Sequence, residues 1–90
     1  MLKIELVPDL SHCIETVAKR EYRDAISKLL SGAEADEVLQ ERVELLRLFL
    51  ETADFKRLRR ESEERLMQGK RVTFALYLEE GTPKYKLRST

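Results

Sequence analysis

The sequence predicts a small α+β domain, with a helical middle packed on one face of a sheet that both chain ends form. Apolar and polar residues alternate near both ends, whereas between residues 10 and 66 apolar residues recur at three- and four-residue steps. The expected order is β-α-α-(α)-β-β, with a mainly antiparallel sheet made of the N-terminal strand and a C-terminal hairpin. A single domain over residues 1–90 is expected, because a chain of this length buries only about 60–65% of its unfolded surface.

The N-terminal part is expected to form a half-buried strand and then a helix. Residues 2–7 alternate between apolar and polar side chains, and Pro8 ends this strand. Asp9 or Ser11 is expected to cap the helix, and Gly32 is expected to end it. The apolar positions of this helix are Leu10, Cys13, Ile14, Val17, Ala18, Ala25, Ile26 and Leu29.

A second helix is expected from Glu34 or Ala35 to about Leu50, and its apolar face is unusually wide. At 100° per residue this face covers about 220°, roughly twice the stripe of an ordinary surface helix. Near Asp54 the apolar phase changes, which leaves two alternatives: a separate third helix over residues 55–68, or one long bent helix. The residues of the wide face are Val38, Leu39, Val43, Leu45, Leu46, Leu48, Phe49 and Leu50.

The C-terminal hairpin contains the clearest strand of the chain, at residues 72–78. A loop with an even number of residues keeps the apolar side chains of both its strands on one face. We expect a four-residue loop over residues 79–82 that contains Gly81, because a two-residue type I′ turn forces Glu80 to positive φ. The expected cross-strand partners are Leu76 with Tyr85 and Phe74 with Leu87, and the same apolar face adds Val72, Leu78, Leu2, Ile4 and Leu6.

The composition indicates a soluble cytoplasmic protein. The 17 basic and 17 acidic residues balance, and this zero net charge argues against a general nucleic-acid or membrane binder. It also predicts weak binding to random duplex DNA near physiological salt. Lys3, Glu5 and Asp9 interrupt any N-terminal signal peptide, and no apolar run is long enough to span a membrane. The single cysteine, Cys13, cannot form an internal disulfide, which suits a reducing compartment.

No enzymatic or metal site is predicted. His12 and Cys13 are the only histidine and the only cysteine, and neighbours on a helix point about 100° apart. They are therefore expected to be a surface imidazole and a core thiol rather than a catalytic dyad. The sequence also lacks the HExxH, CxxC and GxSxG patterns and a glycine-rich phosphate loop. We expect a non-enzymatic protein without a cofactor or metal.

The carboxylates at residues 61–64 are expected to lie on a solvated helix face. Glu61, Glu63 and Glu64 each follow an arginine by four residues, which is the spacing of ion pairs along a helix. The expected pairs are Arg57 with Glu61, Arg59 with Glu63 and Arg60 with Glu64.

The leading hypothesis is an interaction or assembly module that forms a homodimer through the wide face of the second helix. A first helix and a small sheet offer little surface to cover that face, so we expect a second copy to cover it. The apolar seam alternates steps of four and three, as in a short coiled coil. A third helix folded back over the same residues is the alternative. The seam consists of Leu39, Val43, Leu46, Leu50 and Ala53.

The competing hypothesis is a nucleic-acid-binding protein. Helices followed by a hairpin over residues 71–88 resemble a winged-helix domain in outline. The expected nucleic-acid contacts are the basic residues Lys56, Arg59, Arg60, Lys84, Lys86 and Arg88. Lysines on an outer strand also protect a sheet edge against aggregation, which is the alternative interpretation of the cations at residues 84–88.

Overall fold

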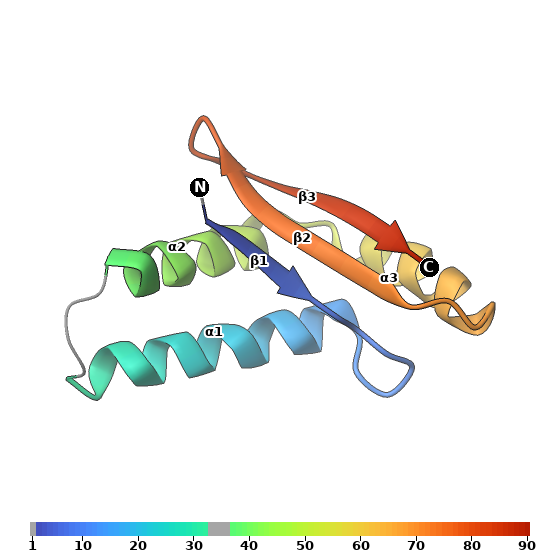
Figure 1. The fold of residues 1–90 in the computed structure, drawn as a ribbon, viewed down its shortest axis with the longest axis horizontal. Coiled ribbons are helices and arrows are strands. Elements are labelled where there is room, and N and C mark those ends of the chain that lie inside the picture. The colour runs from blue at the N-terminus through green and yellow to red at the C-terminus, as the bar shows by residue number, and fades with distance from the viewer. Residues whose placement is uncertain (1, 33–36) are drawn as a thin grey trace.

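Residues 2–32 and 37–90, which the computed structural model describes, form three helices and a three-stranded antiparallel sheet. The elements are β1 (Lys3–Leu6), α1 (Ile14–Leu30), α2 (Glu37–Thr52), α3 (Phe55–Met67), β2 (Val72–Glu79) and β3 (Thr82–Ser89). This β-α-α-α-β-β order, with both chain ends in one sheet, confirms the predicted α+β fold (Figure 1). None of the described helices is long and apolar enough to cross a bilayer.

The sheet has the strand order β1-β2-β3, so β2 is the central strand. β1 runs antiparallel to β2, with Ile4 opposite Leu76 and Leu6 opposite Phe74. The predicted partners within the hairpin are confirmed, since Leu76 pairs with Tyr85 and Phe74 with Leu87. The ladder continues beyond the strands, because Arg71 and Thr90 exchange two backbone hydrogen bonds of 2.9 and 3.0 Å.

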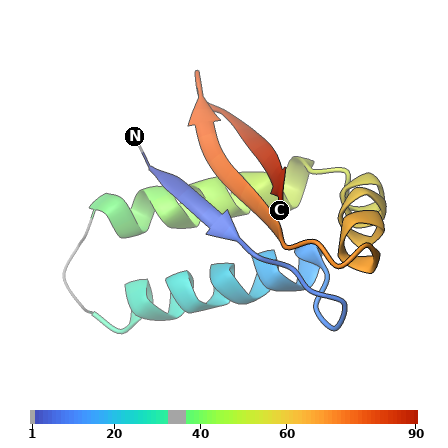
Figure 2. The same ribbon diagram turned by 45° about the vertical axis from the view of Figure 1, so that its right-hand side comes forward.

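The helices cover one face of this sheet, and one apolar cluster fills the space between the two layers. α1 and α2 lie side by side and antiparallel under the sheet, while α3 lies at its end (Figures 1 and 2). Glu21 of α1 accepts a hydrogen bond of 2.9 Å from Arg42 of α2, which links the two helices. The buried cluster consists of Ile4, Leu6, Ile14, Ala18, Ala25, Leu45, Leu46, Phe49, Leu58, Val72, Phe74 and Leu76.

The wide apolar face of α2 contacts two other parts of the same chain. Leu45, Leu46 and Phe49 are buried, and α2 packs against α1 and against the β2–β3 hairpin. α3 is a separate helix that turns away from α2 instead of folding back along it (Figure 2). The Asp54 carboxylate accepts a hydrogen bond of 3.2 Å from the backbone N–H of Arg57, and this cap begins α3.

The start of α1 differs from the prediction, because Asp9 bonds to the loop rather than to the helix. Its carboxylate accepts hydrogen bonds of 2.8 and 2.7 Å from the backbone N–H groups of Ser11 and His12. These bonds form a local turn, so the helix begins only at Ile14. Leu10, expected on the apolar helix face, lies in this turn and is 69% exposed.

Glycines follow the ends of α1 and α3, and Gly32 after α1 is the predicted one. α1 ends before Gly32, whose φ of 77° suits a residue without a Cβ, and Gly69 follows α3 with a φ of 78°. The predicted start of the second helix, at Glu34 or Ala35, lies outside the described residues. Its end is Thr52, two positions after the predicted Leu50.

The loop of the hairpin has two residues, and the prediction of a four-residue loop is wrong. Glu79 pairs with Thr82, and the two residues between them, Glu80 and Gly81, have φ values of 53° and 77°. Two positive φ values define a type I′ turn, whose twist matches the right-handed twist of the strands. Strand pairing up to Glu79 and Thr82 therefore outweighs a strain of about 1–2 kcal/mol at Glu80.

Replacing Glu80 by asparagine is expected to stabilise the protein by about 0.5–1 kcal/mol, because asparagine is several-fold enriched over other residues at positive φ. Urea unfolding followed by circular dichroism measures the change. The matched control is Glu79→Asn, one position earlier in the extended strand, which should give no gain. An equal gain from both variants would show that the loss of a carboxylate, not the turn, is responsible.

Candidate functional site

None of the described helices covers the second face of the sheet, and we call this the outer face. Along β1 and β3 the residues that point to the helices are buried or half-buried except Ser89 at the end of β3, and those between them are exposed. On β2 the outward residue Ala75 is buried, Thr73 and Tyr77 are partly buried, and Glu79 is exposed. The outer face consists of Lys3 and Glu5 from β1, Thr73, Ala75, Tyr77 and Glu79 from β2, and Thr82, Lys84, Lys86 and Arg88 from β3.

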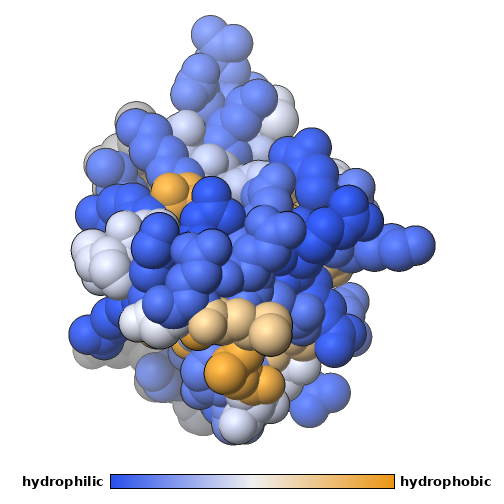
Figure 3. Space-filling model, turned by 90° about the vertical axis from the view of Figure 1, so that its right-hand side faces the viewer, coloured by the Kyte–Doolittle hydropathy of each residue, from blue (hydrophilic) through white to orange (hydrophobic). Residues whose placement is uncertain are grey.

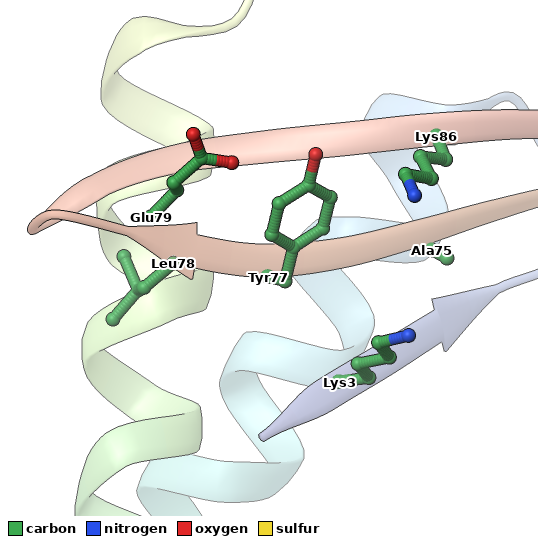
Figure 4. Close-up of a pocket in the computed structure, with 6 residues that line it drawn as sticks. All are labelled: Lys3, Ala75, Tyr77, Leu78, Glu79 and Lys86. Atoms are coloured by element: carbon green, nitrogen blue, oxygen red, sulfur yellow. The ribbon is translucent and has the colours of Figure 1, made fainter. Parts of the chain in front are cut away.

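A shallow hollow lies on the outer face beside Tyr77. Strand pairing sets Tyr77 between Lys3 of β1 and Lys84 of β3. Ala75, two residues earlier, has a small side chain that does not fill the space next to the ring. The hollow of about 180 Å³ is lined by Lys3, Ala75, Tyr77, Leu78, Glu79 and Lys86 (Figure 4).

The tyrosine ring and a lysine interact at the edge of this hollow. In Figure 4 the ring of Tyr77 leans from β2 towards β3, and the side chain of Lys86 points towards it. The Lys86 ammonium lies 5.9 Å from the ring centroid, at the outer limit of a cation–π contact. Such an exposed contact is weak, so both side chains stay available to a partner.

One ion pair crosses the whole outer face. Arg88 of β3 donates a hydrogen bond of 2.7 Å to the Glu5 carboxylate of β1. Ala75 and Thr73 lie between them on β2 and are short enough for the two long side chains to meet above the strand. Because both partners are 61% exposed, this pair contributes only about 0–1 kcal/mol to stability.

The outer face has a surplus of positive charge although the whole chain is neutral. Its cations outnumber its carboxylates two to one: Lys3, Lys84, Lys86 and Arg88 against Glu5 and Glu79. One cation of this set is already paired with Glu5, which leaves the three lysines around Tyr77. The surface is therefore locally attractive to anions.

The structure divides the predicted nucleic-acid contacts between two surfaces. Lys84, Lys86 and Arg88 share the outer face, whereas Lys56, Arg59 and Arg60 lie on α3, on the side of the helices. A continuous cationic surface from α3 to the hairpin, as the winged-helix outline requires, is not formed by these residues. Lys3 and Tyr77 were not among the predicted contacts, and the pairing of β1 with β2 places Lys3 beside Tyr77 on the outer face.

The cations of α3 are partly used in ion pairs along the helix. Arg59 Nε lies 2.9 Å from a Glu63 carboxylate oxygen, and Arg57 Nε lies 3.5 Å from one of Glu61. These are two of the three predicted pairs, whereas Arg60 and Glu64 are not within ion-pair distance. Arg57 also donates a hydrogen bond of 3.2 Å to the Tyr85 hydroxyl, on the inner side of β3.

The seam predicted for self-association lies largely inside one chain. Leu46 is completely buried, so it cannot contact a second copy. The other seam residues are partly buried and pack against the core: Leu39, Val43, Leu50 and Ala53. The homodimer stays a prediction, but its interface is reduced to these four residues.

Large apolar side chains with substantial exposure are scattered over the described surface. They are Val7, Leu10, Leu30, Val38 and Met67. Figure 3 shows the end of the molecule at the right of Figure 1, where hydrophilic side chains dominate and the apolar area is small. This side of the molecule therefore offers no broad apolar surface to a partner.

His12 and Cys13 do not form a dyad. His12 Nδ1 lies 3.2 Å from the Asp9 carboxylate, and Cys13 Sγ lies 3.3 Å from the Thr16 hydroxyl. Cys13 is the N-cap residue of α1 and is half-buried, so the prediction of a core thiol is wrong. Among the described residues, no three side chains of His, Cys, Asp or Glu are arranged to hold a metal ion.

Cys13 lies in a second hollow, between the start of α1 and α3. This hollow of about 280 Å³ is also lined by Glu15, Phe55, Lys56 and Arg59. The hydrogen bond from Thr16 lowers the pKa of the Cys13 thiol. Burial acts in the opposite direction and is the second-largest effect, and the backbone N–H groups of Thr16 and Glu15 and the charge of Arg59 add smaller effects that lower this pKa.

Comparison with known proteins gives a family but no activity. A protein-family model matches residues 2–83. An uncharacterized protein of Archaeoglobus fulgidus is 47% identical over 51 residues, which cover 54% of this chain and 60% of that relative. The chain thus spans less than two thirds of this relative. No solved structure matches.

The thiol of Cys13 is expected to react with iodoacetamide at lower pH than an ordinary cysteine, because the thiolate is the reactive form and its pKa is lowered. Replacing Thr16 by valine removes the main stabilising hydrogen bond, so the pH of half-maximal rate should rise. As control, Thr52→Val removes a helix hydroxyl that bonds to Leu48 instead, and it should leave the rate unchanged. The single cysteine makes mass spectrometry a direct readout.

Proposed function

We propose that this chain, which belongs to the family matched over residues 2–83, is a small non-enzymatic interaction module that binds an anionic partner on the outer face of its sheet. The observation that carries this proposal is the uncovered sheet face with its surplus of cations around Tyr77. Binding there needs no rearrangement, since the sheet is held by the core on its other face.

Protection of the sheet edges accounts for only part of this surface. β1 and β3 are edge strands, and lysines at Lys3, Lys84 and Lys86 discourage pairing with other sheets. Edge protection gives no role to Tyr77, a partly buried aromatic residue on the central strand between these lysines. An aromatic ring at the middle of a cationic surface is typical of a binding face.

Reversing the charge of the outer face is expected to abolish binding to a polyanion. The double variant Lys84→Glu/Lys86→Glu should lose retention on immobilised heparin at about 50 mM salt, whereas the unchanged protein is retained and elutes as salt rises. Both lysines are exposed and lie outside the core, so unfolding free energy should change by about 0.5 kcal/mol or less.

The matched control is Lys56→Glu/Arg60→Glu, which makes the same change in net charge on α3. It should keep most of the heparin retention. Equal losses from the two double variants would show that only net charge matters, and a loss confined to the α3 variant would move the binding surface to that helix. Either result contradicts the proposal.

Self-association through α2 is a second proposal, and the partial exposure of Leu39, Val43, Leu50 and Ala53 supports it. Because the buried seam residue Leu46 is needed for folding, the test must use a seam residue that is partly exposed. Leu50→Glu should split the dimer while helix content is kept, and Leu30→Glu, at a highly exposed position of α1, is the control.

Light scattering measures the mass of both variants and of the unchanged chain at about tens of micromolar. We expect a dimeric mass for the unchanged chain and the control, and a monomeric mass for Leu50→Glu. A monomeric mass of the unchanged chain at that concentration would exclude the homodimer.

A further inference from the structure

We propose that the partner of the outer face is single-stranded RNA, with an unpaired base stacked on Tyr77 and phosphates bound by the lysines around it. This inference rests on the proposed function, because it names the anionic partner of the same surface. Its residues are Tyr77 at the centre, with Lys3, Lys84 and Lys86 as phosphate contacts and Glu79 as a sugar contact.

The geometry combines a stacking platform with cations on both sides. Neighbouring strands lie about 4.8 Å apart, so the pairing of Tyr77 with Lys3 and Lys84 places the two lysines on opposite flanks of the ring. Ala75 beside the ring is an apolar part of the lining of the hollow (Figure 4). A nucleotide has the matching parts, since its base is planar and apolar on its faces and its phosphate is anionic.

Two other occupants fit the outer face less well. A second copy of this chain would bring two faces with the same cationic surplus together, and like charges facing each other oppose association. An acidic peptide supplies carboxylates for the lysines, but its Asp and Glu side chains carry no aromatic ring to stack on Tyr77. The single aromatic side chain among the lysines therefore favours a nucleic acid.

A single strand fits better than a duplex. In a duplex the bases are already stacked and paired, so no base face is open to stack on Tyr77 and the lysines meet mainly the backbone. Phosphate contacts alone give a neutral chain weak, strongly salt-dependent binding. Stacking of an unpaired base on Tyr77 adds binding free energy that salt screens little.

The carboxylate of Glu79 favours RNA over DNA. It lines the hollow together with Lys3 and Lys86, and an ionised carboxylate can only accept hydrogen bonds. It therefore repels a phosphate but can accept a hydrogen bond from a ribose 2′-hydroxyl, the group that distinguishes RNA from DNA. Glu79 thus gives the hollow one position that suits the sugar rather than the phosphate.

Fluorescence anisotropy of the full chain with labelled oligomers tests the proposal at about 50 mM salt. A short uridine oligomer should bind more tightly than its deoxyuridine counterpart and more tightly than a duplex of equal length. Tyr77→Leu should weaken RNA binding about 5- to 100-fold and leave duplex binding unchanged. Tyr77→Phe should keep RNA binding, and Thr73→Ala, on the same strand and face, is the control.

The outcomes separate this inference from the proposed function. If RNA and duplex bind equally and Tyr77→Leu changes neither, while Lys84→Glu/Lys86→Glu weakens both, the outer face binds anions but the RNA inference is wrong. Equal binding of RNA and DNA oligomers, or of RNA and polyglutamate, also overturns it. If no oligomer and no heparin is bound, the proposed function fails as well.

Discussion

The pairing of β1 with β2 is the contact on which the rest of the structure depends. A two-stranded hairpin alone is marginal in water, and β1 supplies the third strand that makes the sheet stable. It also adds Ile4 and Leu6 to the inner face, against which α1 and α2 bury their apolar sides. Because this pairing joins the two ends of the chain, it closes a loop that contains all three helices.

The sequence predicts those features of the fold that depend on periodicity or on a single residue type. An even number of residues in the loop is enough to set Leu76 opposite Tyr85. A glycine at positive φ is a local requirement at Gly32. The loop length could not be predicted in this way, since the twist of a paired hairpin outweighs the preference of Glu80. The width of the apolar face of α2 was likewise visible, but not that α1 and the hairpin cover it.

The candidate site was predicted in part for a similar reason. Alternation places Lys84, Lys86 and Arg88 on one face of β3, and the structure agrees. Lys3 and Tyr77 obey the same alternation, but their meeting depends on the direction and register of β1, which no local pattern determines. The grouping of the α3 cations with those of β3 also required a tertiary arrangement, and in the structure α3 lies at the end of the sheet whereas the β3 cations lie on its outer face.

The zero net charge of the chain does not prevent the binding of an anion, because binding depends on the charges near the site rather than on the total. Charges separated by more than about 8–10 Å are largely screened near physiological salt, and the helices lie on the opposite side of the sheet from the outer face. An anion on the outer face therefore interacts mainly with the lysines around Tyr77 and with Glu5 and Glu79, not with the acids of the helices. A stiff duplex extends beyond a face of this size, since the whole molecule measures 42 × 28 × 22 Å, and cannot bend to follow it. A flexible single strand can keep its charges within the small area where the cations are in excess, so a neutral chain can discriminate between the two forms of nucleic acid.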